Sequence, residues 1–271
     1  MTIDHSLRVE DLTLGYGERT VIEGLDLELV TGGITSVVGA NASGKSTLLR
    51  SMARLLTPRH GQVLLDGRQI HHLPAKQLAR VLGLLPQSPI TPEGITVADL
   101  VGRGRHPHQR LFSRWGTADD EAVAAALDAT RTADLAERPV DELSGGQRQR
   151  VWVAMALAQD TDLLLLDEPT TFLDVSHQVE VLDLLTDLNR ERGITVVMVL
   201  HDLNLAARYS DQLVMIAGRA VAASGPPAEV LTAQRVEEVF GLRSQVITDP
   251  ISGTPLMVPI GRHHSTGPPA P

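Results

Sequence analysis

The feature that most constrains this chain is a glycine-rich segment, Gly39-Ala-Asn-Ala-Ser-Gly-Lys-Ser-Thr47, which matches the pattern G-x-x-x-x-G-K-[ST]. An apolar run at 34–38 precedes it, and residues 48–52 are typical of the start of a helix. Strand, glycine-rich loop and helix in this order are the context in which the pattern indicates phosphate binding. A surface turn with a chance lysine is the alternative, expected in roughly one chain of this length in a hundred. We therefore expect residues 39–47, called here the phosphate loop, to bind a nucleoside triphosphate.

The residues of the phosphate loop have separate expected roles. Gly39 and Gly44 allow the backbone to bend back and point successive N–H groups inward. A helix beginning near Lys45 adds unpaired N–H groups and partial positive charge at its N-terminus. The Lys45 ammonium can reach the β- and γ-phosphates, and the Ser46 hydroxyl can be a ligand of Mg²⁺. The predicted nucleotide contacts of this loop are Gly39, Asn41, Ala42, Ser43, Gly44, Lys45, Ser46 and Thr47.

Length and composition restrict the class of protein. With 271 residues, 42% of them apolar, the chain can form one large domain with a well-filled core. The net charge of −9 argues against a nucleic-acid partner, because such partners usually require a basic face. The chain has no cysteine, which excludes disulfides and thiolate metal sites. It shows neither a signal peptide at residues 1–10 nor a run of about 18 apolar residues, so we expect any membrane association to depend on a partner.

Two strands are predicted ahead of the phosphate loop. Residues 7–14 and 21–29 alternate apolar and polar side chains, with one slip at Glu10-Asp11, as strands of a half-buried antiparallel sheet do. Tyr16 lies between two glycines in the turn that joins them. Its ring is expected either to stack on a nucleobase or to pack on its own hairpin, and the pattern favours neither.

After a predicted hairpin at 61–67 and a predicted helix at 73–80, an apolar strand at 81–85 stops at Pro86 and leaves Gln87 just past its end. Ligands of open α/β sheets lie at such carboxyl ends. Gln87 could therefore contact a metal ion or an attacking water. From the pattern alone, a solvated loop glutamine is the more common explanation.

Residues from about 88 to 141 differ in character and predict an inserted helical subdomain. Helical spacing covers 97–101 and 119–135. The segment between them, 102–115, is basic and irregular. It could dock an acidic or amphipathic segment of a partner, although a solvated charged loop is the more common explanation.

The segment Leu143-Ser-Gly-Gly-Gln147 opens the next predicted helix. Ser144 is suited to cap the helix N-terminus. The same exposed N–H groups could instead bind an anion. From this pattern alone, a capped helix with no further role is the more common explanation.

Two further buried strands end in polar residues. The run Leu163-Leu-Leu-Leu166 suits a central strand covered on both faces, and Asp167 and Glu168 follow it. Asp167 could hold Mg²⁺ and Glu168 could orient the water that attacks a γ-phosphate, the alternative being two carboxylates that cap a turn. The phosphate loop in the same chain favours the catalytic role. The run 194–200 ends at His201, which could donate to a γ-phosphate or be structural, with equal support.

The rest of the chain predicts a helix at 203–209, a strand at 213–216 and a helix within 225–231. From residue 241 onward we expect a short β extension and a disordered tail rich in glycine and proline. Six other histidines lack the spacing of metal ligands and are expected on the surface, namely His71, His72, His106, His108, His263 and His264.

In this order, the motifs resemble those of the ATP-binding subunit of ABC transporters, and the resemblance covers nearly the whole chain. Tyr16 matches the adenine-stacking aromatic residue of that family. The other matching motifs are Walker A (39–47), the Q-loop (Gln87), the LSGGQ signature (143–147), Walker B (163–168), the D-loop (173–174) and the switch histidine (His201).

The resemblance implies an α/β fold of ABC ATPase type. The fold would consist of a RecA-like P-loop NTPase core, an N-terminal antiparallel β subdomain and an inserted α-helical subdomain at about 88–150. The nucleotide-binding domain would cover 1–240. Residues 241–271 would form the C-terminal extension and tail.

The resemblance also implies ATP hydrolysis with ATP and Mg²⁺ as cofactors. The implied catalytic residues are Glu168, His201, Gln87 and Lys45, and the implied Mg²⁺ ligands are Ser46, Gln87 and Asp167. Two copies would form a twofold homodimer in which each ATP lies between Lys45 of one copy and, in the other, Ser144, Gly145, Gly146 and Gln147. The homodimer would drive integral-membrane permease subunits from the cytoplasmic face of the cell membrane, and would serve a substrate-binding protein indirectly.

Four stretches, 102–109, 169–178, 201–204 and 249–256, are similar more narrowly to the ATPases of iron-siderophore importers, whose relatives import cobalamin and haem. Alternatives are a soluble ABC-type ATPase in iron–sulfur assembly, repair or translation, and a nucleotide-binding regulator without turnover. The single nucleotide domain, the lack of long coiled-coil insertions and the net negative charge argue against the repair and translation forms. The presence of both Glu168 and His201 argues against the regulator.

The phosphate loop departs from the family pattern at two alanines. Ala40 and Ala42 stand where the family often has proline and glycine. An alanine at position 42 is expected to be tolerated only with a negative φ, so the departure bears on the geometry of the loop there.

Overall fold

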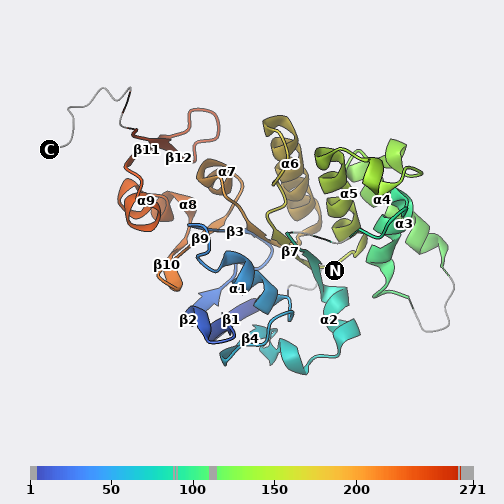
Figure 1. Cartoon of the computed structure of the whole chain (residues 1–271), viewed down its shortest axis with the longest axis horizontal. Helices are drawn as coiled ribbons and strands as arrows, with labels where there is room; N and C mark the ends of the chain where they lie inside the picture. The colour runs from blue at the N-terminus through green and yellow to red at the C-terminus, as the bar shows by residue number, and fades with distance from the viewer. Residues whose placement is uncertain (1–4, 88, 90, 110–114, 262, 264–271) are drawn as a thin grey trace.

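The computed structural model describes residues 5–87, 89, 91–109, 115–261 and 263 (Figure 1). Its centre is a sheet in the strand order β10-β9-β3-β8-β7-β6, in which β10 pairs antiparallel and the other strands pair in parallel. The strands of this central sheet are β3 (Ile34–Gly39), β6 (Leu82–Leu85), β7 (Leu163–Asp167), β8 (Thr195–Val199), β9 (Gln212–Ala217) and β10 (Ala220–Gly225).

An antiparallel sheet in the order β2-β1-β4-β5 forms a second layer. β1 contains a register shift between Val9 and Leu12, and the φ of Asp11 is +46°. This irregularity coincides with the predicted slip in the apolar alternation, because an extra residue in one strand shifts its alternation relative to the partner strand. The predicted hairpin at 61–67 is confirmed as β4 and β5. The strands of this sheet are β1 (Leu7–Tyr16), β2 (Arg19–Glu28), β4 (His60–Leu65) and β5 (Arg68–Gln69).

The helices cover the central sheet and form the inserted region on one side of it (Figure 1). They are α1 (Lys45–Met52), α2 (Ala75–Val81), α3 (Val97–Gly102), α4 (Thr117–Ala129), α5 (Gly145–Ala158), α6 (Val175–Arg192), α7 (Leu203–Arg208), α8 (Pro227–Val230) and α9 (Ala233–Phe240).

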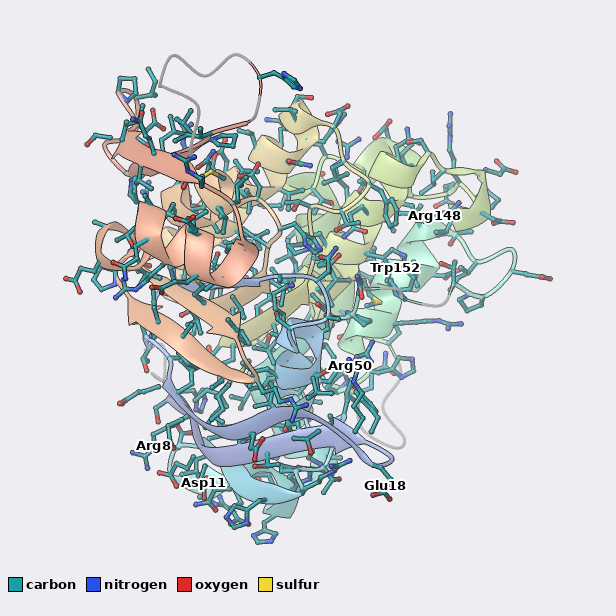
Figure 2. All side chains as sticks on the ribbon, turned by 60° about the vertical axis from the view of Figure 1, so that its left-hand side comes forward. Arg8, Asp11, Glu18, Arg50, Arg148 and Trp152 are labelled. Atoms are coloured by element: carbon teal, nitrogen blue, oxygen red, sulfur yellow. The ribbon has the colours of Figure 1, made fainter. Side chains whose placement is uncertain are left out.

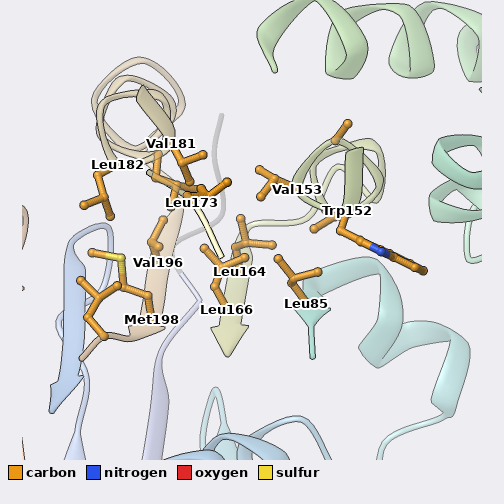
Figure 3. Packing of buried hydrophobic residues seen from close by; sticks show 14 of the residues in the cluster. Leu85, Trp152, Val153, Leu164, Leu166, Leu173, Val181, Leu182, Val196 and Met198 are labelled. Atoms are coloured by element: carbon orange, nitrogen blue, oxygen red, sulfur yellow. The ribbon is translucent and has the colours of Figure 1, made fainter. Parts of the chain in front are cut away.

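The four consecutive leucines of β7 are buried because each face of the strand meets a different layer. Leu164 and Leu166 belong to one core cluster, which includes Val153 of α5 and Val181 of α6 (Figure 3). Leu163 and Leu165 belong to a second cluster, which includes apolar residues of α1 and of the antiparallel sheet. Full coverage of both faces explains why a central parallel strand shows no polar alternation.

The inserted region is helical, as expected, but one predicted helix is shorter. The periodicity at 119–135 predicted a continuous helix, whereas α4 ends at Ala129. Arg131 has a φ of +52°, which breaks the helix, and a short 3₁₀ turn at Ala133–Leu135 follows. The chain therefore turns before Leu135, whose side chain is buried in the core.

The basic segment 102–115 is not a uniformly solvated loop. Arg105 is 6% exposed, and its guanidinium donates to Asp119 Oδ1 at 3.1 Å and to the Ala158 carbonyl at 2.8 Å. A ring nitrogen of His108 lies 2.6 Å from the Gln159 carbonyl oxygen. This histidine is half-buried, whereas the sequence predicted a surface position. Both side chains anchor the segment to the C-terminal end of α5. The part of the docking prediction that falls on 110–114 lies outside the described residues.

His71 also departs from the surface prediction. Its side chain is half-buried, and burial together with nearby Arg54 and His72 lowers its pKa below the usual value. The predicted β extension is confirmed as a hairpin of β11 (Ser244–Thr248) and β12 (Pro255–Pro259). Asn204 holds it through two hydrogen bonds with the Met257 backbone, at 2.7 and 3.1 Å. The predicted disordered tail falls on 262 and 264–271, outside the described residues.

None of the helices in the described part of the chain combines the length and the apolar character that crossing a bilayer requires.

Candidate nucleotide-binding site

Several sequence-predicted residues meet at the carboxyl edge of the central sheet. The phosphate loop follows β3. Asp167 is the last residue of β7, Glu168 comes directly after it, and His201 comes shortly after β8. Because these strands are parallel neighbours, their carboxyl ends lie side by side. They surround a cavity of about 610 Å³, called here the strand-end cavity, which is lined by Tyr16, Arg19, Val21, residues 41–47, Gln87, Glu168 and His201.

Lys45 lies at the base of the phosphate loop and is 6% exposed. Its ammonium donates to the carbonyl oxygens of Gly39 at 2.9 Å and Ala40 at 3.1 Å. Burial lowers the pKa of Lys45, and the nearby carboxylates of Glu168 and Asp167 oppose this shift. The loop therefore holds a buried cation against its own backbone, which suits it to receive an anion.

The backbone around Lys45 also favours an anion. α1 begins at Lys45, and its N-cap residue Gly44 has a φ of +108° and makes no side-chain capping bond. Among the described residues, no side chain therefore caps the first N–H groups of α1 at the wall of the strand-end cavity. At Gly39, a Cβ would lie 2.4 Å from the Ile216 carbonyl oxygen, so no other residue fits there.

The expectation that alanine at position 42 is tolerated only with a negative φ is wrong, because the structure gives +61°. The Ser43 N–H donates to the Ala40 carbonyl at 3.2 Å, which makes Asn41 and Ala42 the central residues of a β-turn. A turn with a positive φ at its second central position is of type II, which favours glycine there. The path of the loop between β3 and α1 thus imposes a left-handed conformation on an alanine.

Replacing Ala42 with glycine is expected to raise the free energy of unfolding by about 0.5–1 kcal/mol. The left-handed conformation costs alanine about 1–2 kcal/mol, and the greater freedom of glycine in the unfolded chain offsets part of that gain. Urea denaturation of the nucleotide-free protein measures the change. Ala40→Gly is the matched control and is expected to lower stability, because Ala40 has no positive φ. A fall in stability for Ala42→Gly as large as for the control would contradict this account.

Ser46 and Asp167 are brought together beside the strand-end cavity. The Ser46 hydroxyl donates to Asp167 Oδ1 at 2.9 Å. Asp167 is 2% exposed, and burial raises its pKa, although the hydrogen bond from Ser46 acts in the opposite direction. A hydroxyl and a carboxylate are hard oxygen ligands of the kind that Mg²⁺ prefers. The pair therefore fits the predicted metal-binding role, with exposed Gln87 at the wall of the same cavity.

Glu168 and His201 contact each other directly. His201 Nε2 lies 2.7 Å from Glu168 Oε1, and the Thr171 hydroxyl donates to Glu168 Oε2 at 3.1 Å. The Glu168 side chain is 7% exposed, whereas that of His201 is 48% exposed. Glu168 also has a φ of +57°, which is uncommon for a residue with a side chain. The sequence analysis did not identify Thr171. The available signal was its position three residues after Glu168, which places its hydroxyl within reach of the carboxylate in a turn.

Tyr16 is 46% exposed at the end of the β1–β2 hairpin and lines the strand-end cavity. Figure 2 shows Arg50 on the part of α1 nearest the antiparallel sheet and Glu18 at the tip of the hairpin. The Arg50 guanidinium donates to the Tyr16 hydroxyl at 3.4 Å. An open ring at the cavity favours base stacking over packing on its own hairpin. The sequence analysis did not identify Arg19 and Val21 as residues that line the cavity. They are two residues apart on β2 and therefore lie on the same face of the strand.

The signature segment lies elsewhere. Ser144 caps α5 by accepting from the Gln147 N–H at 3.2 Å, and Gln147 Oε1 accepts from the Ser144 N–H at 3.1 Å. Among the described residues, the lining of the strand-end cavity includes none of 144–147. Phe172, which lies near Gly145, is 82% exposed, and Val175 at the start of α6 is 77% exposed. One chain therefore does not bring Ser144, Gly145, Gly146 or Gln147 to its own Lys45.

A phosphate loop between a parallel strand and a helix, beside a strand-end Asp-Glu pair, defines a P-loop nucleotide hydrolase. The family profile described as "ABC transporter" matches residues 22–171. The chain belongs to the ABC transporter family. Family membership confirms the expected ABC ATPase fold, the ATP-binding character and the hydrolase activity.

Two curated relatives match almost the whole chain. The ferric enterobactin transport ATP-binding protein of Escherichia coli K12 is 54% identical over 256 residues, 94% of this chain and 94% of that protein. The achromobactin transport ATP-binding protein of Dickeya dadantii is 54% identical over 252 residues, 93% of this chain and 94% of that protein.

Solved structures match the fold over similar lengths. A chain from a metal-chelate type ABC transporter in an inward-facing conformation has a TM-score of 0.81 and 30% identity, covering 96% of this chain and 98% of its own. A dimeric ATP-binding cassette in a post-hydrolysis state, bound to ADP and Pi, has a TM-score of 0.72 and 27% identity, covering 81% of this chain and 98% of its own.

Proposed function

We propose that this chain is the ATP-hydrolysing subunit of an importer of ferric siderophores. The observation that carries the proposal is the strand-end cavity, where the phosphate loop, Glu168 and His201 meet in a chain 54% identical to two siderophore transport ATPases. These relatives give less support to cobalamin or haem as the cargo, or to a non-transport ATPase. Cargo choice itself belongs to the permease and the binding protein.

The residues of the cavity supply the groups that γ-phosphate transfer needs. The Lys45 ammonium and the first N–H groups of α1 bind the β- and γ-phosphates, and the Tyr16 ring stacks on adenine. Glu168 orients a water molecule and accepts its proton as the water oxygen bonds to the γ-phosphorus. The bond from that phosphorus to the bridging oxygen breaks, and ADP and phosphate leave. His201 donates to a γ-phosphate oxygen from its position beside Glu168.

Ser46 and Asp167 would hold Mg²⁺, with Gln87 nearby. When bound, the ion neutralises charge on the β- and γ-phosphate oxygens. Within the described residues, no group of three or more histidine or acidic side chains is arranged for a metal. The remaining ligands of the ion would come from phosphate oxygens and water, as is usual for Mg²⁺ in nucleotide sites.

We also propose a twofold homodimer as the working unit. The signature residues lie outside the cavity of their own chain, and a structural relative is a dimer bound to ADP and Pi. Each ATP would lie between Lys45 of one copy and Ser144, Gly145, Gly146 and Gln147 of the partner subunit. The exposed apolar side chain of Phe172 near Gly145, and that of Val175 three residues later, support a contact between copies.

The dimer would dock on integral-membrane permease subunits at the cytoplasmic face of the cell membrane, as a peripheral subunit. A substrate-binding protein would deliver the chelate to the permease. Residues 1–240 would form the nucleotide-binding domain, with the helical subdomain at about 88–150, and residues 241–271 the extension. Release of phosphate removes a group held from both sides, so hydrolysis opens the dimer and resets the permease.

Deletion of the gene is expected to abolish uptake of iron supplied as ferric siderophore and to spare uptake of ferrous iron, because only the chelate requires this importer. Radioactive iron uptake measures both. Complementation with the wild-type chain should restore uptake, whereas Glu168→Gln should not. Cobalamin and haem uptake serve as parallel controls. Unchanged siderophore uptake in the deletion strain would reject the cargo assignment.

A further inference from the structure

Among the residues that the structure describes, one side-chain hydrogen bond joins α5, the helix that the signature segment opens, to the loop that carries Glu168. Gln149 lies on the second turn of α5, and its amide Nε2 donates to the Pro169 carbonyl at 3.0 Å in a partly buried setting. Pro169 directly follows Glu168 on the loop after β7. The bond therefore connects the inserted helical region with the central sheet at the residue next to the proposed general base.

The loop after β7 needs such support because its backbone is strained. Glu168 has a φ of +57°, a conformation that side chains disfavour and that persists only when the surroundings fix it. The Thr171 N–H donates to the Glu168 carbonyl at 3.2 Å, while Thr171 and His201 hold the carboxylate. Pro169 has no N–H, so its carbonyl is the only backbone group through which this residue can be hydrogen-bonded.

The start of α5 packs against the same loop a few residues later. A Cβ placed on Gly146 would lie 3.5 Å from the Leu173 side chain, and one on Gly145 would lie 4.0 Å from Phe172. A displacement of α5 therefore acts on the loop at both ends, through packing at 172–173 and through Gln149 at Pro169. The hydrogen bond is directional, whereas the packing contact is not.

We propose that Gln149 is a positioning residue, through which the position of α5 controls the alignment of Glu168 in the same chain. This inference rests on the proposed function, in which the N-terminus of α5 binds a phosphate held by the partner subunit. A seated α5 keeps the Gln149 amide on the Pro169 carbonyl and thereby keeps the Glu168 carboxylate aligned with its water. A displaced α5 withdraws the amide, and the strained loop relaxes. Occupation of one ATP site thus favours hydrolysis at the other.

The test compares Gln149→Met, which keeps the length and helix propensity but removes the donor, with Gln149→Lys, which restores a donor. For Gln149→Met we expect kcat to fall about five- to tenfold, the size of one lost hydrogen bond, with Kd for ATP changed less than about twofold. The Hill coefficient for ATP should also move towards one. Gln149→Lys should recover kcat to within about twofold of wild type. Gln234→Met, on α9, is the control and should match wild type.

Thermal unfolding separates positioning from general stability. Gln149→Met is expected to keep the wild-type Tm within about 2 °C while kcat falls, because the lost bond is one of many. Wild-type kcat in Gln149→Met, or a loss that follows Tm and is not recovered by Gln149→Lys, would overturn the inference while the proposed function stands. Absence of ATP turnover in the wild-type protein would reject the proposed function and this inference together.

Discussion

Replacing Glu168 with glutamine is expected to lower kcat at least about 100-fold while ATP binding is retained. Glutamine has the same shape as glutamate but cannot accept the proton of the attacking water, and general-base catalysis contributes about 10²–10⁴-fold. His201 and Thr171 each lie within hydrogen-bond distance of one oxygen of the Glu168 carboxylate. The amide of glutamine has the same size and can take the place of the carboxylate between these two residues. Phosphate release measures turnover, and a fluorescent ATP analogue measures binding.

The same variant also reports on the homodimer. If the γ-phosphate holds the two copies together, Glu168→Gln should accumulate as a dimer with ATP but not with ADP, measured by size-exclusion chromatography. Glu191→Gln is the matched control, because Glu191 is exposed near the end of α6, and it should show wild-type turnover. Wild-type turnover in Glu168→Gln would show that this carboxylate is not the base.

The sequence predicted the central sheet and much of the site because both depend on local patterns. The apolar runs at 163–166 and 194–200 are buried on both faces, and they contain no ionisable residue to obscure them; their one polar side chain, Thr195, is itself buried. The carboxylates and the histidine of the site come only after these strands. Since parallel strands present their carboxyl ends at one edge, Asp167, Glu168 and His201 were expected to converge there, and the structure places them together.

Backbone conformation and contacts between distant segments were not predictable from those patterns. Ala42 and Glu168 take positive φ values because the path between two fixed elements requires them, and neither residue type signals it. Arg105 belongs to a basic run that by composition favours a solvated loop, yet it is buried and pairs with Asp119 of α4 and the Ala158 carbonyl of α5. The hydrogen bond from Gln149 to the Pro169 carbonyl forms only when the helical region meets the sheet.

Replacing Lys45 with alanine is expected to weaken ATP binding about 10- to 100-fold and to reduce turnover below about 1% of wild type. Within the part of the chain that the structure describes, the buried ammonium bonds to two loop carbonyls alone, so it is positioned for charge-assisted hydrogen bonds to phosphate. Lys45→Arg should not restore activity, because the planar guanidinium is larger and has a different donor geometry. Titration with a fluorescent nucleotide and phosphate release measure the two effects.

The chain offers a clean control for this change, because Lys76 is its only other lysine. Lys76 is exposed on α2, and Lys76→Ala should bind and hydrolyse ATP like wild type. Tm of nucleotide-free Lys45→Ala should stay close to wild type, since removing the ammonium relieves its desolvation while two hydrogen bonds are lost. Unchanged ATP affinity would remove Lys45 from the phosphate contacts. Equal weakening for ADP and ATP would place the ammonium mainly on the β-phosphate, whereas a larger loss for ATP would place it on the γ-phosphate, as transfer of that group requires.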